Sequence, residues 1–389
     1  MEIKAYIKLK PNEEVNILKG FPWIYKNEVK EIGGEISSGG IVKVYDSNSK
    51  FVGIGYINLA SKIIVRMLTL DDCEINQAFI TNRVLQAVYL RKDLGIYDAC
   101  RLIFSEGDLL PGVIVDKFND YLVIEIATYG AERLKELIIN ALVDVVRPLG
   151  IYERSDGQNR KKEGLEPHIG FIGDEFDPNI IIEEHGLKVE VDILNGQKTG
   201  YFFDQRNNRE LISKYVNGKK VLDCCTHTGS FSMHALKYGA ESVTAVDISN
   251  TALLQTKKNL MLNNMEATLV ESDAFMYLDS IEKGTFDVII LDPPAFIKNT
   301  QSFDSGCAGY AKLNAKALSK LNQGGILITF SCSGLLKAED FLEVLNMASK
   351  KSGASTQLLD FRLQAEDHPM LLERLEKMYL KCAVLRVVK

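Results

Sequence analysis

Hydrophobic and polar positions alternate through the first 70 residues of the chain. Four short segments carry the pattern, and they are EIKAYIKLK, GGIVKVYD, FVGIGYIN and KIIVRML. Alternation with a period of two, at short intervals broken by glycine, is typical of strands in a small closed sheet. We therefore expect residues 1–72 to form a small β-barrel.

The period changes after residue 72. Apolar residues then recur at helical intervals, at Ile75, Phe79, Val84, Val88 and Leu90. A hairpin pattern follows, with Asn119 and Asp120 at its turn. A second helical segment, AERLKELIINALVDVVRPLG, ends at Pro148 and Gly150. Residues 73–185 are therefore predicted to form a small α+β domain.

From Lys219 onward, apolar strands alternate with amphipathic helices, beginning with KKVLDCC, FSMHALKYG and SVTAVD. This order predicts parallel βαβ units under helices, which is a doubly wound, Rossmann-like α/β sheet. Two last segments, STQLLDFRLQ and YLKCAVLRVVK, have no helical pattern between them and predict an antiparallel edge. Residues 186–389 form this third predicted domain, and its edge strands leave room for a homodimer.

Composition narrows the class of protein. No segment approaches the roughly 20 apolar residues of a membrane span, and no apolar signal core precedes the first strand. The seven cysteines lack CxxC spacing, and the five histidines form no metal-ligand pattern. We therefore expect a cytoplasmic protein with free thiols, no membrane contact and no metal. A net charge of −6 disfavours a general nucleic-acid coat but leaves room for a local basic groove.

One polar segment, YERSDGQNRKKEGLEPHIG, brings four basic side chains close together in sequence, Arg154, Arg160, Lys161 and Lys162. Charge runs of this kind usually form solvated loops. A loop that faces RNA is the alternative, and the sequence leaves both open.

Four aspartates stand where predicted strands end, Asp223, Asp247, Asp273 and Asp292. Ligands of a doubly wound sheet bind beyond these strand ends, and four acids would repel a pyrophosphate. S-adenosylmethionine (SAM) instead offers a sulfonium, an ammonium and ribose hydroxyls to carboxylates. A nicotinamide enzyme is the competitor, but the turn has a single glycine rather than Gly-x-Gly-x-x-Gly and carries an acid at Asp223.

Individual roles follow from these positions. Asp247 is placed for both ribose hydroxyls, and Asp273, followed by Ala274, for the adenine amino group. Gly229 would let the turn approach the cofactor, with hydroxyl donors on either side. The remaining members assigned to the cofactor site are Thr228, Ser230, Phe231, Ile248 and Asp292. The alternative for each aspartate is a helix N-cap.

The chemistry is expected after the fourth and fifth strands of this domain. Asp292 is followed by two prolines, which stiffen the turn so that its carboxylate stays aimed at the cleft. Cys332 follows the fifth strand between two serines, where a thiolate can add to a cytosine ring and activate its carbon 5. A structural turn and a buried packing cysteine are the alternatives. Cys307 is the reserve thiol.

Several motifs resemble one family, the RlmI-type ribosomal RNA cytosine-5 methyltransferases, which join an N-terminal PUA domain to a class I methyltransferase domain. They are GFPWIYKNEV, EGDLLPGVIVDKF, YERSD, GQKTGYFFDQRNNRE, DHP at residues 367–369 and YLK at residues 379–381. The likeness spans nearly the whole chain. Phe21 stands where histidine is usual, and Ala295 follows the proline pair, as expected for this branch.

The resemblance implies a function and site residues. Cys332 is implied to be the nucleophile, with Asp292 as its catalytic partner and Arg206 available to the methionine carboxylate of SAM. The implied substrate is a cytosine in 23S ribosomal RNA of the large subunit, held in part by the PUA domain. The RNA contacts assigned with it are Lys10, Trp23, Arg154 and Lys161. His368 is left between a place beside the base and a helix-capping role.

Two other functions remain open. In a base N-methyltransferase, the Asp292 turn would grip an exocyclic amine and Cys332 would be incidental. In a ribosome assembly factor, the fold would bind RNA without turnover. If removal of the Cys332 thiol abolishes activity, the protein is the cytosine-5 enzyme and not the base N-methyltransferase. If the protein binds no SAM, the assembly factor is favoured.

Overall fold

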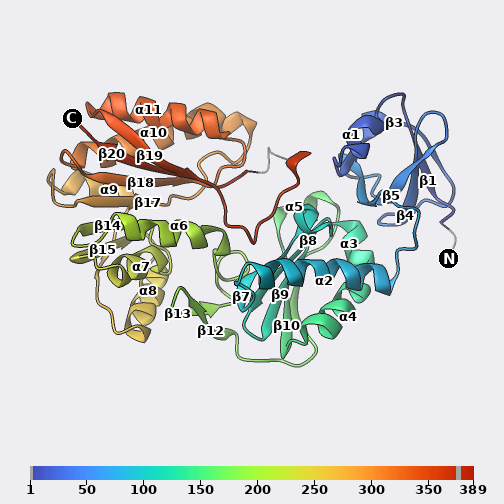
Figure 1. Cartoon of the computed structure of the whole chain (residues 1–389), viewed down its shortest axis with the longest axis horizontal. Coiled ribbons are helices and arrows are strands. Elements are labelled where there is room, and N and C mark those ends of the chain that lie inside the picture. Colours follow the sequence, from blue (N-terminus) through green and yellow to red (C-terminus); the bar gives the residue numbers. More distant parts are fainter. Residues whose placement is uncertain (1–2, 374–377) are drawn as a thin grey trace. The chain divides into compact units, whose positions relative to one another are not determined.

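The structure is a computed structural model that describes residues 3–373 and 378–389, and it divides the chain into two compact units (Figure 1). The first unit comprises Met1–Ile180, Val191–Phe203 and Glu366–Leu375. The second comprises Ile181–Glu190, Asp204–Ala365 and Glu376–Lys389. The domain boundaries expected after residues 72 and 185 stay a prediction.

The first unit begins with a six-stranded sheet in the order β2-β6-β5-β4-β1-β3. All four predicted strand segments are strands, and two further short strands lie at the two ends of the sheet. The bounds are β1 Tyr6–Leu9, β2 Trp23–Tyr25, β3 Val29–Gly33, β4 Ile41–Tyr45, β5 Phe51–Ile57 and β6 Ile63–Thr69, with α1 at Glu14–Leu18. Strand β1 alternates between half-buried and buried residues, as its sequence pattern predicts.

The same unit holds a five-stranded sheet in the order β11-β10-β9-β8-β7. Its strands are β7 Ala99–Phe104, β8 Val113–Phe118, β9 Tyr121–Ile126, β10 Gly150–Ser155 and β11 His168–Ile172. Its helices are α2 Gln77–Asp93, α3 Tyr129–Arg133, α4 Lys135–Val146 and α5 Gln158–Lys162. The predicted hairpin turn is confirmed, since β8 pairs with β9 around Asn119 and Asp120.

Helix α2 differs from its predicted face. Leu90 is exposed, and the buried positions near the helix end are Val88 and Arg91. Arg91 is buried because its guanidinium binds both carboxylate oxygens of Asp108 and the Arg101 carbonyl. A periodicity of apolar residues cannot show a buried ion pair of this kind.

The polar segment after residue 150 is not a solvated loop. It forms β10, α5 and β11, and the Arg160 side chain is 4% exposed. The Arg160 guanidinium donates to the Ile126 carbonyl at 2.9 Å and to the Glu132 carboxylate at 2.6 Å. The sequence pattern could not show this, because the partly exposed Glu132 carboxylate and the Ile126 carbonyl lie far from Arg160 in sequence.

A two-stranded sheet links the two units along the chain, formed by β12 Asn179–Glu184 and β13 Leu187–Asp192. The second unit is built on a seven-stranded sheet in the order β16-β15-β14-β17-β18-β20-β19. Its strands are β14 Lys220–Cys224, β15 Ser242–Asp247, β16 Thr268–Glu271, β17 Val288–Leu291, β18 Ile326–Ser331, β19 Thr356–Arg362 and β20 Lys381–Val387.

The second unit confirms the predicted doubly wound sheet. Strands β14 to β18 pair in parallel, and β20 pairs antiparallel with both β18 and β19. The two segments without a helical pattern between them are therefore the antiparallel side of the sheet. Strand β19 lies at its edge, and the homodimer expected there stays a prediction.

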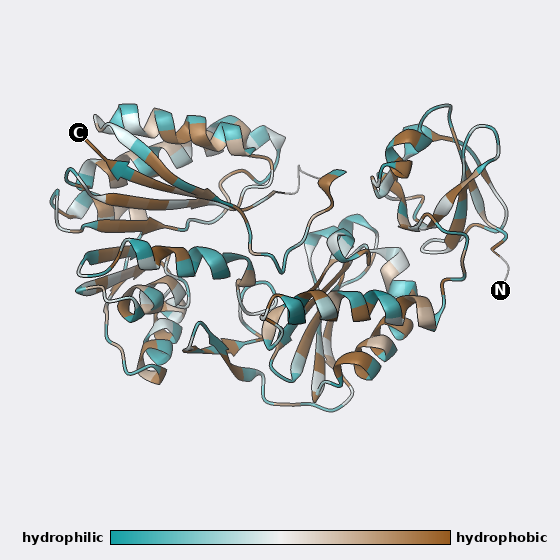
Figure 2. Cartoon of the chain, in the orientation of Figure 1, coloured by the Kyte–Doolittle hydropathy of each residue, from teal (hydrophilic) through white to brown (hydrophobic). Residues whose placement is uncertain are grey.

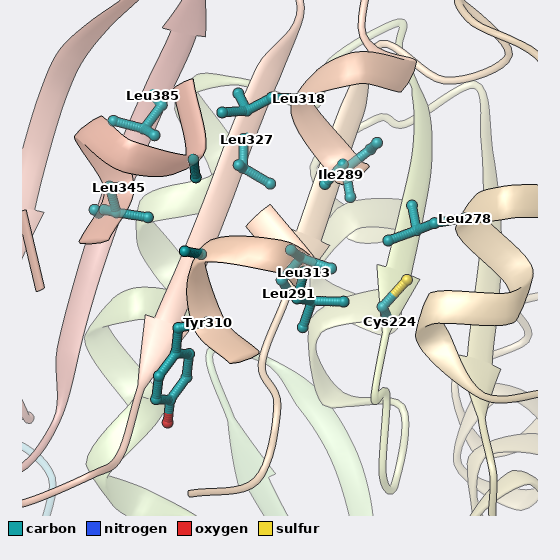
Figure 3. Close-up of a cluster of buried hydrophobic side chains, with 14 of the residues drawn as sticks. Cys224, Leu278, Ile289, Leu291, Tyr310, Leu313, Leu318, Leu327, Leu345 and Leu385 are labelled. Carbon is teal, nitrogen blue, oxygen red and sulfur yellow. The ribbon is translucent and has the colours of Figure 1, made fainter. Parts of the chain in front are cut away.

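Helices cover both faces of this sheet (Figure 1). One face packs against α9 Ala274–Ser280, α10 Phe303–Lys320 and α11 Ala338–Ser352 through a cluster that includes Leu278, Tyr310 and Leu345 (Figure 3). The other packs against α6 Arg206–Leu211 and α7 Ser230–Lys237, and α8 Asn250–Leu262 follows β15. Strand β17 is apolar along its length, β18 is mostly apolar, and α11 carries both polar and apolar residues (Figure 2).

Helix α10 begins at Phe303. Its first turns contain Gly306 and Gly309, which weaken a helical pattern. Gly306 is explained by packing, because a Cβ there would lie 2.3 Å from a side-chain carbon of Ile297. The reserve thiol, Cys307, therefore lies on a helix.

No helix within residues 3–373 and 378–389 combines the length and apolar character needed to cross a bilayer. The expected cytoplasmic location stays a prediction.

Candidate functional site

The four aspartates of the predicted cofactor site lie at the carboxyl ends of the parallel strands, where Asp223 is the last residue but one of β14. Asp247 is the last residue of β15, Asp273 follows β16, and Asp292 follows β17. Their proximity has an electrostatic consequence at Cys225, directly after β14. Burial raises the pKa of the Cys225 thiol, and all four carboxylates raise it further. The negative charges of all four carboxylates therefore act on the half-buried Cys225 thiol. They favour its protonated form, so we assign Cys225 a packing role.

Asp223 is fully buried in β14. Its Oδ2 accepts hydrogen bonds from the hydroxyls of Thr226 at 2.6 Å and Ser232 at 2.7 Å. Its Oδ1 has no hydrogen-bond partner among the described residues. Burial raises the pKa of Asp223 to about 6, although the two hydroxyls lower it. A buried carboxylate oxygen of this kind fits a ligand that brings a hydrogen-bond donor or a positive charge.

The Asp247 carboxylate is held in place by backbone amides. Its Oδ2 accepts from the His227 amide and its Oδ1 from the Ser249 amide, each at 2.9 Å. Each oxygen keeps further acceptor capacity for a diol. The next residue, Ile248, is 72% exposed, which leaves a large apolar side chain beside the fixed carboxylate. This pair suits a ribose with its adenine ring.

Asp273 is the N-cap of α9, so the helix-capping alternative holds for this aspartate. Its Oδ1 accepts from the amides of Phe275 at 2.8 Å and Met276 at 3.2 Å. The helix-capping alternative does not hold for Asp223 and Asp247, because Gly229 and Ser249 occupy the N-cap positions of α7 and α8. Ala274, assigned to the same site, is buried as the first residue of α9.

A hollow of about 410 Å³ opens between α9, α10 and the turn after β17. Apolar and aromatic side chains line much of it, and Lys298 adds a positive charge. Its lining residues are Phe275, Pro294, Ala295, Phe296, Lys298, Ser305, Gly306 and Gly309. The hollow therefore adjoins the Asp292 turn.

The turn between β14 and α7 needs glycine for reasons of its own packing. Gly229 has φ +81°, and a Cβ there would lie 2.5 Å from the Cγ2 of Thr256 in α8. The glycine is thus required by its backbone conformation and by the neighbouring helix, and its close approach to the cofactor stays a prediction. The Thr228 carbonyl accepts from the Asn259 amide at 3.0 Å.

Two further residues assigned to the cofactor site lie in α7. Ser230 is buried, and its carbonyl accepts from Nδ1 of His234 at 2.7 Å. The Phe231 ring packs against Phe330, with ring centroids 5.1 Å apart, inside the core of the second unit. The side chain of Phe231 therefore belongs to the core, and any contact of these two residues with the cofactor stays a prediction.

Arg206 begins α6 and is 8% exposed. Its Nε lies 3.8 Å from a carboxylate oxygen of Glu184, which is itself held by Arg209 through hydrogen bonds of 2.5 and 2.8 Å. Burial alone would raise the pKa of Glu184, but the Arg209 charge and its hydrogen bonds outweigh it, so this pKa falls to about 2. The proposed contact of Arg206 with the methionine carboxylate stays a prediction.

The Glu184 network also includes two histidines, and no sequence motif predicted it. Nε2 of His234 lies 3.2 Å from Nδ1 of His185, and the two rings and Glu184 place possible metal ligands within 4.8 Å of one another. Burial lowers the pKa of His234 to about 3. Spacing along the chain could not show the cluster. Both Glu184 oxygens are bound by Arg209, so the arrangement serves as an ion-pair and hydrogen-bond network.

Asp292 and Cys332 lie at adjacent strand ends. The Cys332 thiol donates to the Pro293 carbonyl, with Sγ and O 3.9 Å apart, and is half-buried. Gln205, which the sequence analysis missed, donates from its Nε2 to Asp292 Oδ2 at 3.0 Å. The signal for Gln205 was its place inside the FFDQR segment.

The second serine of the SCS motif joins the two turns. Ser333 is fully buried, and its Oγ accepts from the Ile297 amide at 3.2 Å and lies 3.0 Å from the Tyr310 hydroxyl. The turn after β17 is therefore tied to the turn that carries Cys332. These bonds hold the thiol and the carboxylate in one small region.

Three other cysteines of the second unit have raised pKa values, which disfavour the thiolate. Burial raises the pKa of Cys224 and of Cys382 well above the ordinary thiol value. Burial and two nearby aspartates also raise the pKa of Cys307 on α10. The reserve thiol is therefore held toward its unreactive, protonated form.

The predicted RNA contacts lie in the first unit. Lys10 is exposed, and its ammonium donates to the Asn27 carbonyl at 2.6 Å. Trp23 is half-buried rather than in the barrel core, and its Nε1 donates to the Glu106 carboxylate at 2.7 Å. The Arg66 guanidinium lies 5.1 Å from the Trp23 ring centroid. These partners hold the indole in place, and its contact with RNA stays a prediction.

The two other predicted RNA contacts, Arg154 and Lys161, differ in what their side chains bind. Arg154 donates to the carbonyls of Ile193 at 3.2 Å and Gly196 at 2.6 Å, so its guanidinium supports the backbone. Lys161 is exposed on α5. His368 does not cap a helix: it is buried, bound to Asp367 at 2.7 Å and packed on Phe104.

Comparison with known proteins agrees with this geometry. Residues 7–70 match a family model described as a PUA-like domain, and residues 170–352 match an S-adenosylmethionine-dependent methyltransferase. The chain is 39% identical to ribosomal RNA large subunit methyltransferase I of Shewanella frigidimarina over 393 residues, which covers 98% of this chain and 99% of that protein. It is 38% identical to the protein of that name from Escherichia coli O6:K15:H31, covering 98% of each.

Solved structures share the fold. A SAM-dependent methyltransferase from Streptococcus mutans aligns with a TM-score of 0.82 and 23% identity over 98% of this chain and all of that one. A methyltransferase crystallised with SAH aligns with a TM-score of 0.83 and 22% identity over 99% of this chain and all of that one. The chain therefore belongs to the ribosomal RNA large subunit methyltransferase I family, with a PUA-like N-terminal domain and a SAM-dependent methyltransferase domain.

Proposed function

We propose that this protein methylates carbon 5 of a cytosine in 23S ribosomal RNA through a covalent adduct with Cys332. The observation that carries the proposal is the placement of a half-buried thiol against the Pro293 carbonyl, one residue from the Asp292 carboxylate. The relatives at 38–39% identity, which are named for ribosomal RNA of the large subunit, support the substrate class.

The acidic strand ends supply the residues that would hold SAM. The open Oδ1 of Asp223 is suited to the ammonium side of the molecule, and Asp247 with Ile248 to the ribose and adenine. When bound, SAM supplies a methyl group made electrophilic by its sulfonium. Arg206 is the basic residue proposed for the methionine carboxylate.

Cys332 and Asp292 would divide the work on the base. Cytosine C5 is too poor a nucleophile to react unaided, so the Cys332 thiolate first forms a bond from sulfur to C6. The C5=C6 electron pair moves toward N3, which takes the proton that Asp292 accepted when the Cys332 thiol became a thiolate. The ring is then an enamine with a nucleophilic C5, and this carbon would take the methyl group as the bond from that methyl to the SAM sulfur breaks, leaving S-adenosylhomocysteine.

Release of the product reverses the addition. A base removes the proton from C5, and the electron pair left behind restores C5=C6. The bond from sulfur to C6 breaks and returns the thiolate, while N3 gives its proton back to Asp292. Gln205 would orient the Asp292 carboxylate during both transfers, since it donates to Oδ2 at 3.0 Å.

Transfer of labelled methyl from SAM to 23S RNA tests the proposal. Cys332→Ala should abolish methylation, while Cys307→Ala, its matched control on α10, should retain it. RNA with 5-fluorocytosine, which has no C5 proton to release, should trap wild-type protein in a complex stable to denaturant. Full activity of Cys332→Ala would favour a base N-methyltransferase instead.

The target nucleotide is identified in the cell. Bisulfite sequencing of ribosomal RNA from a strain lacking this chain should show that one protected cytosine is lost. An unchanged pattern would contradict the cytosine-5 assignment, and absence of SAM binding in calorimetry would favour an assembly factor without turnover.

A further inference from the structure

A buried lysine lies beside the proposed nucleophile. Lys381 is the first residue of β20, and it pairs across the sheet with Ser331, the residue before Cys332. Its side chain is fully buried, which is rare for lysine. The packing of the core does not need a charge at this place, so the ammonium requires an explanation.

The Lys381 ammonium uses all three of its N–H donors on backbone carbonyls. It donates to Ser333 at 2.7 Å, to Leu336 at 2.7 Å and to Tyr379 at 2.9 Å. Ser333 and Leu336 belong to the turn that follows Cys332. Lys381 therefore fixes the turn that carries the thiol, from the opposite strand.

All three N–H donors of this ammonium bind carbonyls, so no carboxylate within residues 3–373 and 378–389 accepts a hydrogen bond from it. The hydroxyl of Tyr379, which precedes β20, donates instead to Asp204 at 2.6 Å. Burial lowers the pKa of Lys381 to about 8, and the charge of Cys332 acts in the opposite direction. Carbonyls alone compensate a buried ammonium incompletely, whereas a thiolate beside it would complete the pair.

We propose that Lys381 is a positioning residue for Cys332: it holds the turn that carries the thiol and supplies the positive charge that favours the thiolate. A nearby cation stabilises a thiolate, and the effect is reciprocal, because the thiolate also favours the ammonium. The catalytic use of that thiolate rests on the function proposed above. The stabilisation itself does not depend on turnover.

Alkylation of Cys332 as a function of pH tests the proposal on the full-length protein. Iodoacetamide is the probe, and mass spectrometry of the Cys332 peptide gives the rate. The midpoint in wild type should lie below that of free cysteine in the same buffer. Lys381→Met keeps the apolar stem and should raise the midpoint by about one pH unit, which lowers the thiolate fraction at pH 7 about tenfold.

Two further variants separate charge from packing. Lys381→Arg keeps the charge and should hold the midpoint below that of Lys381→Met. Lys258→Met removes an exposed lysine that pairs with Glu190 at 3.3 Å, and it should leave the midpoint unchanged. Circular dichroism checks that each variant is folded.

The refuting results are distinct. A wild-type midpoint at or above that of free cysteine would overturn the proposal without any variant. So would a folded Lys381→Met protein that loses methylation while its Cys332 midpoint stays unchanged, because Lys381 would then be structural only. Full methylation by Cys332→Ala would instead sink the covalent mechanism and leave the alkylation result standing.

Discussion

Removing the Glu184 carboxylate should destabilise the second unit at neutral pH. Glu184 is 2% exposed and binds Arg209 through both oxygens. The fall of its pKa from an ordinary 4.5 to about 2 corresponds to about 3 kcal/mol of stability above pH 4.5. Glu184→Gln also removes the negative charge that accepts two hydrogen bonds from the buried Arg209 guanidinium, so we expect a cost of about 3–5 kcal/mol.

The sign of the pH dependence follows from the direction of the shift. A carboxyl with a lowered pKa in the folded state stabilises the protein above its unfolded pKa and loses this contribution as pH falls. The difference between wild type and Glu184→Gln should therefore shrink below pH 4.5, by about 1 kcal/mol at pH 3.5. Glu183→Gln, the exposed neighbour, is the control and should change stability by less than about 0.5 kcal/mol.

The assay must report the correct part of the chain. The single tryptophan, Trp23, lies in the first unit, so its fluorescence does not follow the Glu184 network. Hydrogen exchange of the α7 peptide does, because His234 of that helix lies 3.8 Å from Glu184. A difference between wild type and Glu184→Gln that stays constant from pH 7 to pH 3.5 would refute the reasoning, as would equal effects of Glu183→Gln and Glu184→Gln.

Three other changes have defined outcomes. Asp223→Asn removes the carboxylate with the open oxygen, and calorimetry should show SAM binding at least about tenfold weaker; unchanged affinity would remove this residue from the site. Gly229→Ala should cost about 1–3 kcal/mol in thermal unfolding, partly recovered by Thr256→Ser, which removes the methyl group 2.5 Å from the new Cβ. Arg91→Met should cost about 3–5 kcal/mol because it strands the buried Asp108 carboxylate; a loss below 1 kcal/mol would contradict the ion-pair account.

Much of the site could be predicted because the positions of its residues follow from where each strand ends along the chain. In a parallel sheet all carboxyl ends meet at one edge. Recognising the strands of the second unit was therefore enough to predict that Asp247, Asp273 and Asp292 lie close together. Periodicity also predicted the barrel strands and the antiparallel edge. These features depend on the chain within about 15 residues, where side-chain spacing decides which face is apolar.

Other features depend on partners far away in the sequence. Arg91 and Arg160 are buried only because Asp108, Glu132 and several carbonyls meet them after folding. Gly229 is required by the side chain of Thr256 as much as by its own turn.

The sequence by itself determined which residues end the strands, and hence which acids and which thiol can meet. The tertiary structure decided how each is held: Asp223 keeps one open oxygen, Asp273 caps a helix, and Lys381 reaches the turn after Cys332. The physical reason is that strand and helix patterns follow short-range spacing, whereas hydrogen-bond partners and burial depend on which distant segments pack together.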